Sequence, residues 1–126
     1  MAERLVLCPL DLVLGESLDR PNSTVTQLTM HRDYRVFGQL DERCRESDDM
    51  PMLETLPIPA SFQLITCDDE GEHPSREDTQ GRPLRYIMAG ELKKLNVPSD
   101  SEPPNQAIKA FVDGLSDDIP IVLYWA

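Results

Sequence analysis

The sequence predicts an α+β fold, a two-layer domain with a mixed sheet of about four strands and two to three helices. Three observations support this prediction. Apolar and polar residues alternate over residues 61–67, apolar residues recur at helical spacing over 105–115, and residues 119–125 form a nearly continuous apolar run. A hairpin followed by a helical connection to a last strand is typical of a two-layer α+β arrangement. The 126 residues are expected to form one domain, residues 1–126.

The predicted strands begin with the apolar run 5–14, which Pro9 breaks or places at the edge of a sheet. Residues 61–67 are expected to pair antiparallel with residues 84–87 across a long polar loop. The run 119–125 is apolar at both alternating sets of positions, so it is expected to be buried on both faces. This run and the strand 61–67 are therefore predicted to be central strands of the sheet.

The predicted helices cover residues 32–45, 89–96 and 105–115. Asn105 is expected to be the N-cap of the third helix, because its side-chain oxygen can accept a hydrogen bond from a free backbone N–H of the first turn. Four apolar positions of this helix are expected to face the core: Ile108, Phe111, Val112 and Leu115.

Charge restricts the classes of function. The chain carries 12 Lys and Arg against 23 Asp and Glu, which gives a formal net charge of −11 and a sequence pI near 4.4. Nucleic acids need basic side chains that neutralise phosphates, and anionic membranes attract polybasic segments, so neither is an expected direct partner. A field of this sign favours encounter with a basic protein. Solubility alone is the competing explanation for the charge.

The cysteines and the N-terminal residues favour a cytoplasmic protein. Cys8, Cys44 and Cys67 are odd in number and widely separated, so they are expected to be reduced thiols without a structural disulfide. The short apolar run near the N-terminus is interrupted by Pro9 and lacks a preceding basic region, so it does not fit a secretory signal.

Acidic residues are concentrated in two of the three predicted connections, which cover residues 46–60, 68–82 and 97–104. Residues 68–78 hold six acids and residues 41–54 hold another six. If the fold brings both segments to one face, their summed potential steers a basic partner toward it. The residues expected to bind this partner are Asp68, Asp69, Glu70, Glu72, Glu77, Asp78, Asp48 and Asp49.

Two other kinds of site are considered. Residues 67–73 offer sulfur, oxygen and nitrogen donors but have neither the spacing of a calcium loop nor the paired ligands of a zinc site. A solvated acidic loop is therefore expected, with no metal and no cofactor. A small enzyme or regulatory subunit that uses scattered carboxylates and His31 or His73 is the alternative to a binding protein. His31 lies near Asp33 and Cys44 in the sequence, but no nucleophile signature accompanies them.

Residues 31–35 form the one locally basic stretch that contains an aromatic residue. Such a stretch can contact an anion near a helix N-terminus. The expected role of Arg32 and Arg35 is nevertheless to form surface ion pairs with neighbouring acids. Three aromatic residues are expected to anchor the core rather than to form a ligand platform: Tyr86, Tyr124 and Trp125.

Several stretches follow one another in a recognisable order. His31–Phe37 contains an Arg-(Asn/Asp)-Tyr-x-x-Phe pattern, and four others follow it: Gly81–Tyr86, Ala89–Leu92, Asn105–Ile108 and Pro120–Trp125. Together they resemble a layout in small bacterial and phage-encoded proteins that have no established activity. The resemblance covers about half of the chain, rests mainly on core and turn residues, and transfers no catalytic residue. It implies a bacterial or phage origin.

Size, charge and this implied origin predict a non-enzymatic acidic binding or inhibitor protein. By analogy, such proteins act by occupying the surface of a partner such as a defence nuclease or a toxin. A nucleic-acid-binding surface is a natural target because it already presents Lys and Arg spaced for phosphates, which carboxylates can replace. The sequence does not identify the partner or the oligomeric state.

Overall fold

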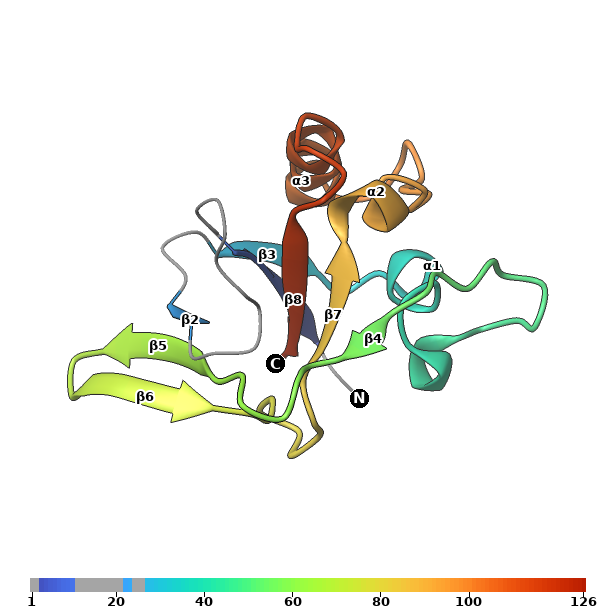
Figure 1. The fold of residues 1–126 in the computed structure, drawn as a ribbon. Helices are drawn as coiled ribbons and strands as arrows, with labels where there is room; N and C mark the ends of the chain where they lie inside the picture. The colour runs from blue at the N-terminus through green and yellow to red at the C-terminus, as the bar shows by residue number, and fades with distance from the viewer. Residues whose placement is uncertain (1–2, 11–21, 24–26) are drawn as a thin grey trace.

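The computed structural model describes residues 3–10, 22–23 and 27–126, which form eight strands in two sheets together with three α-helices and one 3-10 turn (Figure 1). The predicted α+β class is confirmed. The structure has more strands than the expected four, and they form a five-stranded sheet and a three-stranded sheet. No helix in the described part of the chain is long and apolar enough to cross a membrane.

The five-stranded sheet is antiparallel throughout and has the order β3-β1-β8-β7-β4. Its strands are β1 (Arg4–Pro9), β3 (Leu28–His31), β4 (Leu56–Pro57), β7 (Arg85–Met88) and β8 (Pro120–Trp125). β1 ends at Pro9, in line with the expectation that Pro9 breaks the apolar run, but the alternative that Pro9 places the strand at an edge is wrong. β1 lies between β3 and β8, and Pro9 is tolerated because it is the last residue of the strand.

Strand β8 is buried on both faces, as its apolar sequence predicts. Ile121, Leu123 and Trp125 belong to one core, whereas Val122 belongs to a second core on the opposite face. β1 contributes side chains to both cores in the same alternation, in register with β8. The predicted role of β8 as a central strand is therefore confirmed.

Helices cover the first of these two faces. They are α1 (Tyr34–Phe37), α2 (Ala89–Leu92) and α3 (Pro103–Asp113), with the 3-10 turn η1 at Glu42–Cys44. The single helix expected over residues 32–45 is instead α1 and η1, separated by residues 38–41.

Side-chain caps explain this interruption. The Asp33 carboxylate accepts a hydrogen bond from the backbone N–H of Arg35 at the start of α1, and Asp41 does the same for Arg43 at the start of η1. Asp41 therefore favours a new start rather than continuation of the helix, and Gly38 has a low propensity for a helix interior.

Helix α3 also differs from its prediction. It begins at Pro103, with Glu102 in the N-cap position, because proline is well suited to the first turn, where backbone N–H groups have no intrahelical acceptor. Asn105 therefore lies inside the first turn and is not the N-cap. Phe111, expected in the core, is 45% exposed, whereas Ile108 and Val112 are buried.

The second sheet contains β2 (Asn22–Ser23), β5 (Leu64–Asp68) and β6 (Gly71–Ser75), in the order β2-β5-β6. The β2–β5 pair is parallel and the β5–β6 pair is antiparallel, so this sheet is the mixed one. β5 is its middle strand, which corrects the prediction that residues 61–67 share a sheet with β8.

The predicted pairing of residues 61–67 with 84–87 is also wrong. β5 pairs with β6, inside the stretch expected to be a loop, across a two-residue connection that ends at Gly71, where φ is +119°. Glycine adopts this backbone conformation without a steric penalty. β7 is occupied on both sides, by β8 and by β4, and has no free edge for β5.

A second core joins the two sheets. Phe62 and Leu64, at the base of β5, pack with Cys8 and Val122 on the face of the large sheet opposite the helices. Tyr86 and Tyr124 are partly buried against this core, and Trp125 is buried in the first core, as expected for anchoring aromatics.

The described cysteines are free thiols. Cys8 and Cys44 are both buried, and burial raises the pKa of the Cys8 thiol to about 12. The side chain of Cys67 lies outside the described residues, so the prediction of three free thiols is tested for two of them.

The first strand was predicted over the apolar run 5–14. Residues 11–14 of this run lie outside the described residues.

Side chains bind the backbone at the β3 edge of the large sheet and in the segment that precedes β4. At β3, the Asn105 side-chain oxygen accepts from the His31 backbone N–H at 2.8 Å, and its amide nitrogen donates to the His31 carbonyl at 3.1 Å. Beside β4, the Arg85 guanidinium donates to the hydroxyl and the carbonyl of Thr55. The fully buried Asn105 amide thus acts as a short substitute strand that satisfies an edge open to further pairing.

Replacing Asn105 with alanine should lower the free energy of unfolding by about 2 kcal/mol, because two strand-edge groups lose their partner. Urea unfolding followed by circular dichroism measures this change. Ala107→Ser, at an exposed position of the same helix, is the control and should change stability by less than about 0.5 kcal/mol. Equal, small changes in both variants would show that water satisfies the β3 edge equally well.

Deletion of residues 121–126 should abolish cooperative folding. The deletion removes most of β8, and each large side chain lost is worth about 1.5–3 kcal/mol against a typical total stability of about 5–15 kcal/mol. Thermal unfolding of the shortened chain, followed by near-ultraviolet circular dichroism, should show no transition. A cooperative transition would contradict the central place of β8.

Candidate functional site

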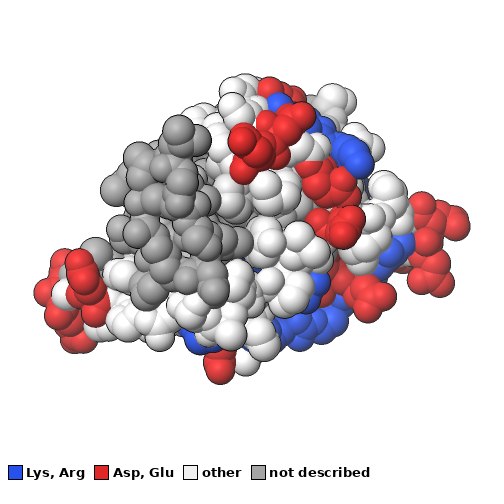
Figure 2. All heavy atoms as spheres, in the orientation of Figure 1, with Lys and Arg blue, Asp and Glu red and all other residues white. Residues whose placement is uncertain are grey.

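The two acidic segments lie at opposite ends of the molecule. The tip of the β5–β6 hairpin is at the left of Figure 1, and the loop that follows α1 and η1 is at the right. Figure 2 shows acidic side chains gathered at both of these ends. The condition that both segments share one face is therefore not met, and each end must be judged separately.

The hairpin end carries most of the predicted binding residues. Asp69, Glu70 and Glu72 are exposed at or beside its turn, and Glu77 is exposed beyond β6. Asp68 is the last residue of β5, and its side chain lies outside the described residues. The carboxylates of Asp69, Glu72 and Glu77 make no ion pair or hydrogen bond with another described residue. They are available to a partner.

Asp78 does not belong to this surface, which corrects its predicted role. It is 7% exposed, and its carboxylate accepts hydrogen bonds from the backbone N–H groups of Gln80 and Arg82, at 2.8 and 3.1 Å. Burial raises the pKa of this carboxyl group. Asp78 thus holds the tight turn that ends at Arg82, where the Arg82 guanidinium also binds Asp41. Its role is structural.

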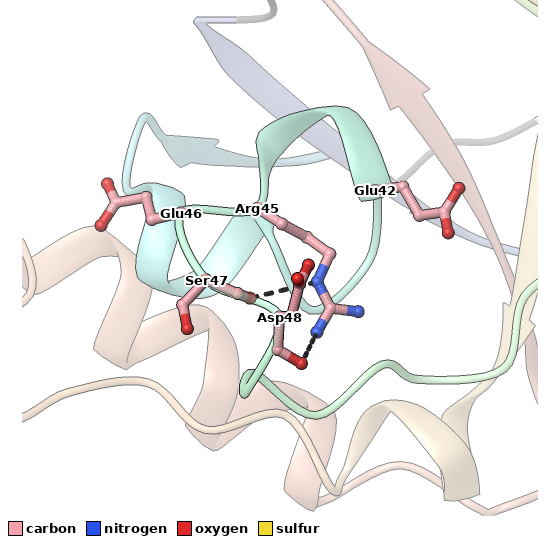
Figure 3. Close-up of a pocket in the computed structure, with 5 residues that line it drawn as sticks. All are labelled: Glu42, Arg45, Glu46, Ser47 and Asp48. Atoms are coloured by element: carbon pink, nitrogen blue, oxygen red, sulfur yellow. Dashed lines mark hydrogen bonds between the residues drawn. The ribbon is translucent and has the colours of Figure 1, made fainter.

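The opposite end carries Asp48 and Asp49, both exposed. A surface hollow of about 500 Å³ lies here, and Arg45 lines it together with Ser47 and acidic residues (Figure 3). The Arg45 guanidinium donates to the backbone carbonyls of Ser47, Asp48 and Met50, so it folds the loop around itself. The positive charge of Arg45 offsets part of the acidic charge of this loop, unlike at the hairpin tip.

Most basic side chains are committed to contacts within the chain. Arg76 donates to the carbonyls of Pro59 and Phe62, which fastens the base of the hairpin. The lysines are held in three ion pairs, Lys93–Asp117, Lys94–Glu91 and Lys109–Asp113. Basic groups therefore hold the fold together, and the excess of acids is left on the surface.

Residues 31–35 form ion pairs, as expected, rather than an anion site. Arg35 binds Asp33 at 2.9 Å and Asp100 at 2.8 Å, and Arg32 lies 3.9 Å from Glu3. Hydrogen bonding to Arg35 holds the pKa of Asp33 below its ordinary value.

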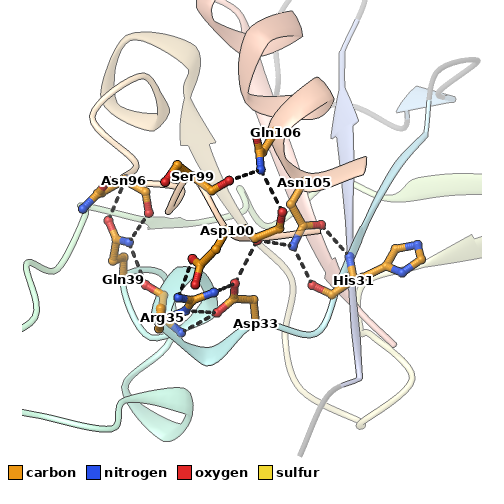
Figure 4. Close-up of polar contacts among 10 residues, drawn as sticks. His31, Asp33, Arg35, Gln39, Asn96, Ser99, Asp100, Asn105 and Gln106 are labelled. Carbon is orange, nitrogen blue, oxygen red and sulfur yellow. Dashed lines mark hydrogen bonds and ion pairs between the residues drawn. The ribbon is translucent and has the colours of Figure 1, made fainter. Parts of the chain in front are cut away.

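This cluster continues into a polar network that joins α1 to α3 (Figure 4). The Ser101 hydroxyl donates to Asp33 at 2.8 Å and accepts from the buried Asn105 amide at 3.2 Å. Gln39 links to the backbone of Asn96 through two hydrogen bonds. The sequence does not indicate this network, because the hydrogen bonds from Gln39 to Asn96 and from Ser101 to Asp33 join residues more than 50 positions apart.

The alternative of a small enzyme gains no geometric support. His31 is half-exposed and lies 2.7 Å from Glu102, and both residues line an open surface hollow of about 610 Å³. Burial raises the pKa of the Cys44 thiol, which opposes its use as a thiolate nucleophile. His73 is exposed on the hairpin strand β6. Among the described residues, no three His, Cys, Asp or Glu side chains are placed to hold a metal ion.

Comparison with known proteins adds no relative: no family model, no curated protein and no solved structure matches the chain.

The Asp33 carboxylate should make stability depend on pH. Its pKa is lowered in the folded state, so its contribution is present above the unfolded pKa and is lost as the pH falls through the folded pKa. Asp33→Asn should be less stable than the natural protein at neutral pH, and the difference should shrink as the pH falls through the folded pKa of Asp33. Urea unfolding at several pH values tests this, and a difference that stays constant with pH would contradict it.

Proposed function

We propose that this protein is a non-enzymatic binding protein whose acidic β5–β6 hairpin occupies a basic surface of a protein partner. The observation that carries the proposal is the set of exposed carboxylates at the hairpin end, where Asp69, Glu72 and Glu77 have no partner among the described residues. Five residue pairs fix the backbone of this hairpin. Its charges are thus presented on an ordered scaffold, which reduces the entropy lost on binding.

Two features favour the hairpin over the opposite acidic loop. The loop contains Arg45, whose guanidinium lies among the loop's own carbonyls, whereas the nearby cation at the hairpin, Arg76, is directed toward the base. The β5–β6 hairpin also projects from the body of the molecule (Figure 1). A projecting acidic hairpin can enter a concave basic surface, which a flat acidic surface cannot do.

The partner we propose is a protein with a nucleic-acid-binding surface, such as a defence nuclease or a toxin. Such a surface presents Lys and Arg spaced for phosphates, and carboxylates separated along a hairpin can take their places. The protein would then compete with nucleic acid in the cytoplasm of a bacterium, as an anti-defence or immunity protein encoded by a phage or by the bacterium itself. This partner class rests on charge, and on the origin implied by the sequence resemblance.

Charge reversal at the two ends provides a matched test of this function. The hairpin variant carries Asp69→Lys, Glu70→Lys and Glu72→Lys, and the control carries Glu46→Lys, Asp48→Lys and Asp49→Lys, so both change the net charge equally. A partner isolated on the immobilised protein at low salt is purified, and its affinity is measured by surface plasmon resonance. The hairpin variant should bind at least about tenfold more weakly, and the control should change affinity far less.

The association rate of the natural protein should also fall between low and physiological salt, since the Debye length shortens to about 8 Å. Equal loss of affinity in both variants would show that only the total charge matters and would contradict the hairpin as the site. An association rate indifferent to salt would mean that the charge serves solubility alone.

A further inference from the structure

A groove of about 700 Å³ lies on the helical side of the large sheet, away from the β5–β6 hairpin. It is formed by residues 40–43, residues 52–55, Arg85 of β7, and the end of β8. These segments are far apart in the sequence and meet only in the folded chain. The volume falls within the range of about 300–1,000 Å³ that is usual for small-ligand sites.

The floor of the groove is apolar and held in place. Leu40, Leu53, Leu123 and Trp125 line it, each less than one-tenth exposed. The Trp125 ring meets the Phe37 ring edge to face at 5.2 Å between centroids, and the Arg82 guanidinium lies 5.9 Å from its centre. These two contacts hold the Trp125 indole in one position, so the floor of the groove is formed before any ligand binds.

Met52 adds an exposed apolar side chain beside this floor. It is 40% exposed and, with Phe111 on α3, is one of two large hydrophobic residues exposed to this degree in the described part of the chain. A methionine side chain is flexible and polarisable, so it adapts to ligands of different shape. Its exposure would be reduced by an apolar group seated in the groove.

The rim carries charges of both signs. Arg43 and Glu42 lie on the wall formed by η1, and Arg85 and Glu54 lie on the side of β4 and β7. Asp41 also lines the groove, but its carboxylate is neutralised by Arg82 and Arg43. A purely anionic ligand would meet the two glutamates, and a purely cationic ligand would meet the two arginines.

The four rim charges are not equally committed. The Arg85 guanidinium is held by Thr55, whereas the Arg43 side chain is 62% exposed and its guanidinium makes a long contact, 3.5 Å, with Asp41 among the described residues. Glu42 adjoins Arg43 in the same turn and also lines the neighbouring hollow around Arg45. Glu54, exposed on the other wall, is placed to meet the opposite end.

We propose that this groove binds a short zwitterionic peptide with apolar side chains. The peptide carboxylate binds Arg43, its ammonium group binds Glu54, and its side chains lie on the floor of Leu53, Leu123 and Trp125. The inference goes beyond the proposed function, because the groove and the hairpin are separate surfaces. Its test therefore does not depend on the hairpin partner.

Trileucine is the probe, and Trp125 is the reporter, since it is the only tryptophan of the chain. Titration with trileucine should change the Trp125 fluorescence in a saturable way, with matching heat in isothermal titration calorimetry. N-acetyl-trileucine lacks the ammonium group and trileucine amide lacks the carboxylate, so each should bind at least about tenfold more weakly. Triserine, without apolar side chains, should not bind.

Two variants assign the ends of the peptide. Arg43→Gln should bind trileucine and its amide equally, and Glu54→Gln should bind trileucine and its N-acetyl form equally. Glu77→Gln, on the hairpin, is the control and should keep the full discrimination. Circular dichroism of each variant confirms its fold before titration.

Each other outcome overturns the proposal. No saturable signal with trileucine would show that the groove is not a peptide site. Equal binding of trileucine and both blocked forms would show apolar burial without recognition of charge. Weaker binding of only one blocked form would assign the groove to a simple carboxylate or a simple amine ligand instead.

Discussion

Burial of strand β8 on both faces is the constraint on which the rest of the structure depends. β8 is paired with β1 and β7, and its alternate side chains enter two separate cores. Neither face of such a strand can carry a charge without a partner. The acidic residues in the described part of the chain therefore lie on the elements around it, in the hairpin, the loops and the helices. The central strand thus excludes unpaired charge from the middle of the large sheet.

The sequence predicts the parts of the fold that have a local signal. β8 is recognisable from its continuous apolar run, and α3 is recognisable from helical spacing, with an error of two residues at its start. β3 was missed because it is only four residues long. Its place in the sheet depends on pairing with β1 and on the side-chain amide of Asn105, which lies 74 positions from His31 in the sequence. β6 was missed because it is exposed and polar, although Gly71 after two polar residues is a typical signal for a turn between strands.

The candidate sites show the same division between local and non-local information. Composition identified Asp69, Glu70 and Glu72 as surface acids, but it also included Asp78, whose burial follows from a turn that the sequence does not display. The two acidic segments were expected on one face, and only the sheet order shows that they lie apart. The groove beside Trp125 draws on four separate segments, so no single stretch of sequence could indicate it.

The arginines explain how an acidic chain keeps its negative charge available to a partner. Arg35, Arg76 and Arg82 bind carboxylates or carbonyls within the chain, where they stabilise loops and capped turns. Exposed ion pairs of this kind contribute little to stability, and salt weakens them, but salt also relieves the mutual repulsion of a net charge of −11. These two effects on the folded state oppose each other. When the hairpin binds a basic partner, salt weakens the attraction and no second effect opposes this. Salt is therefore expected to lower the affinity for the partner more than it lowers the stability of the fold.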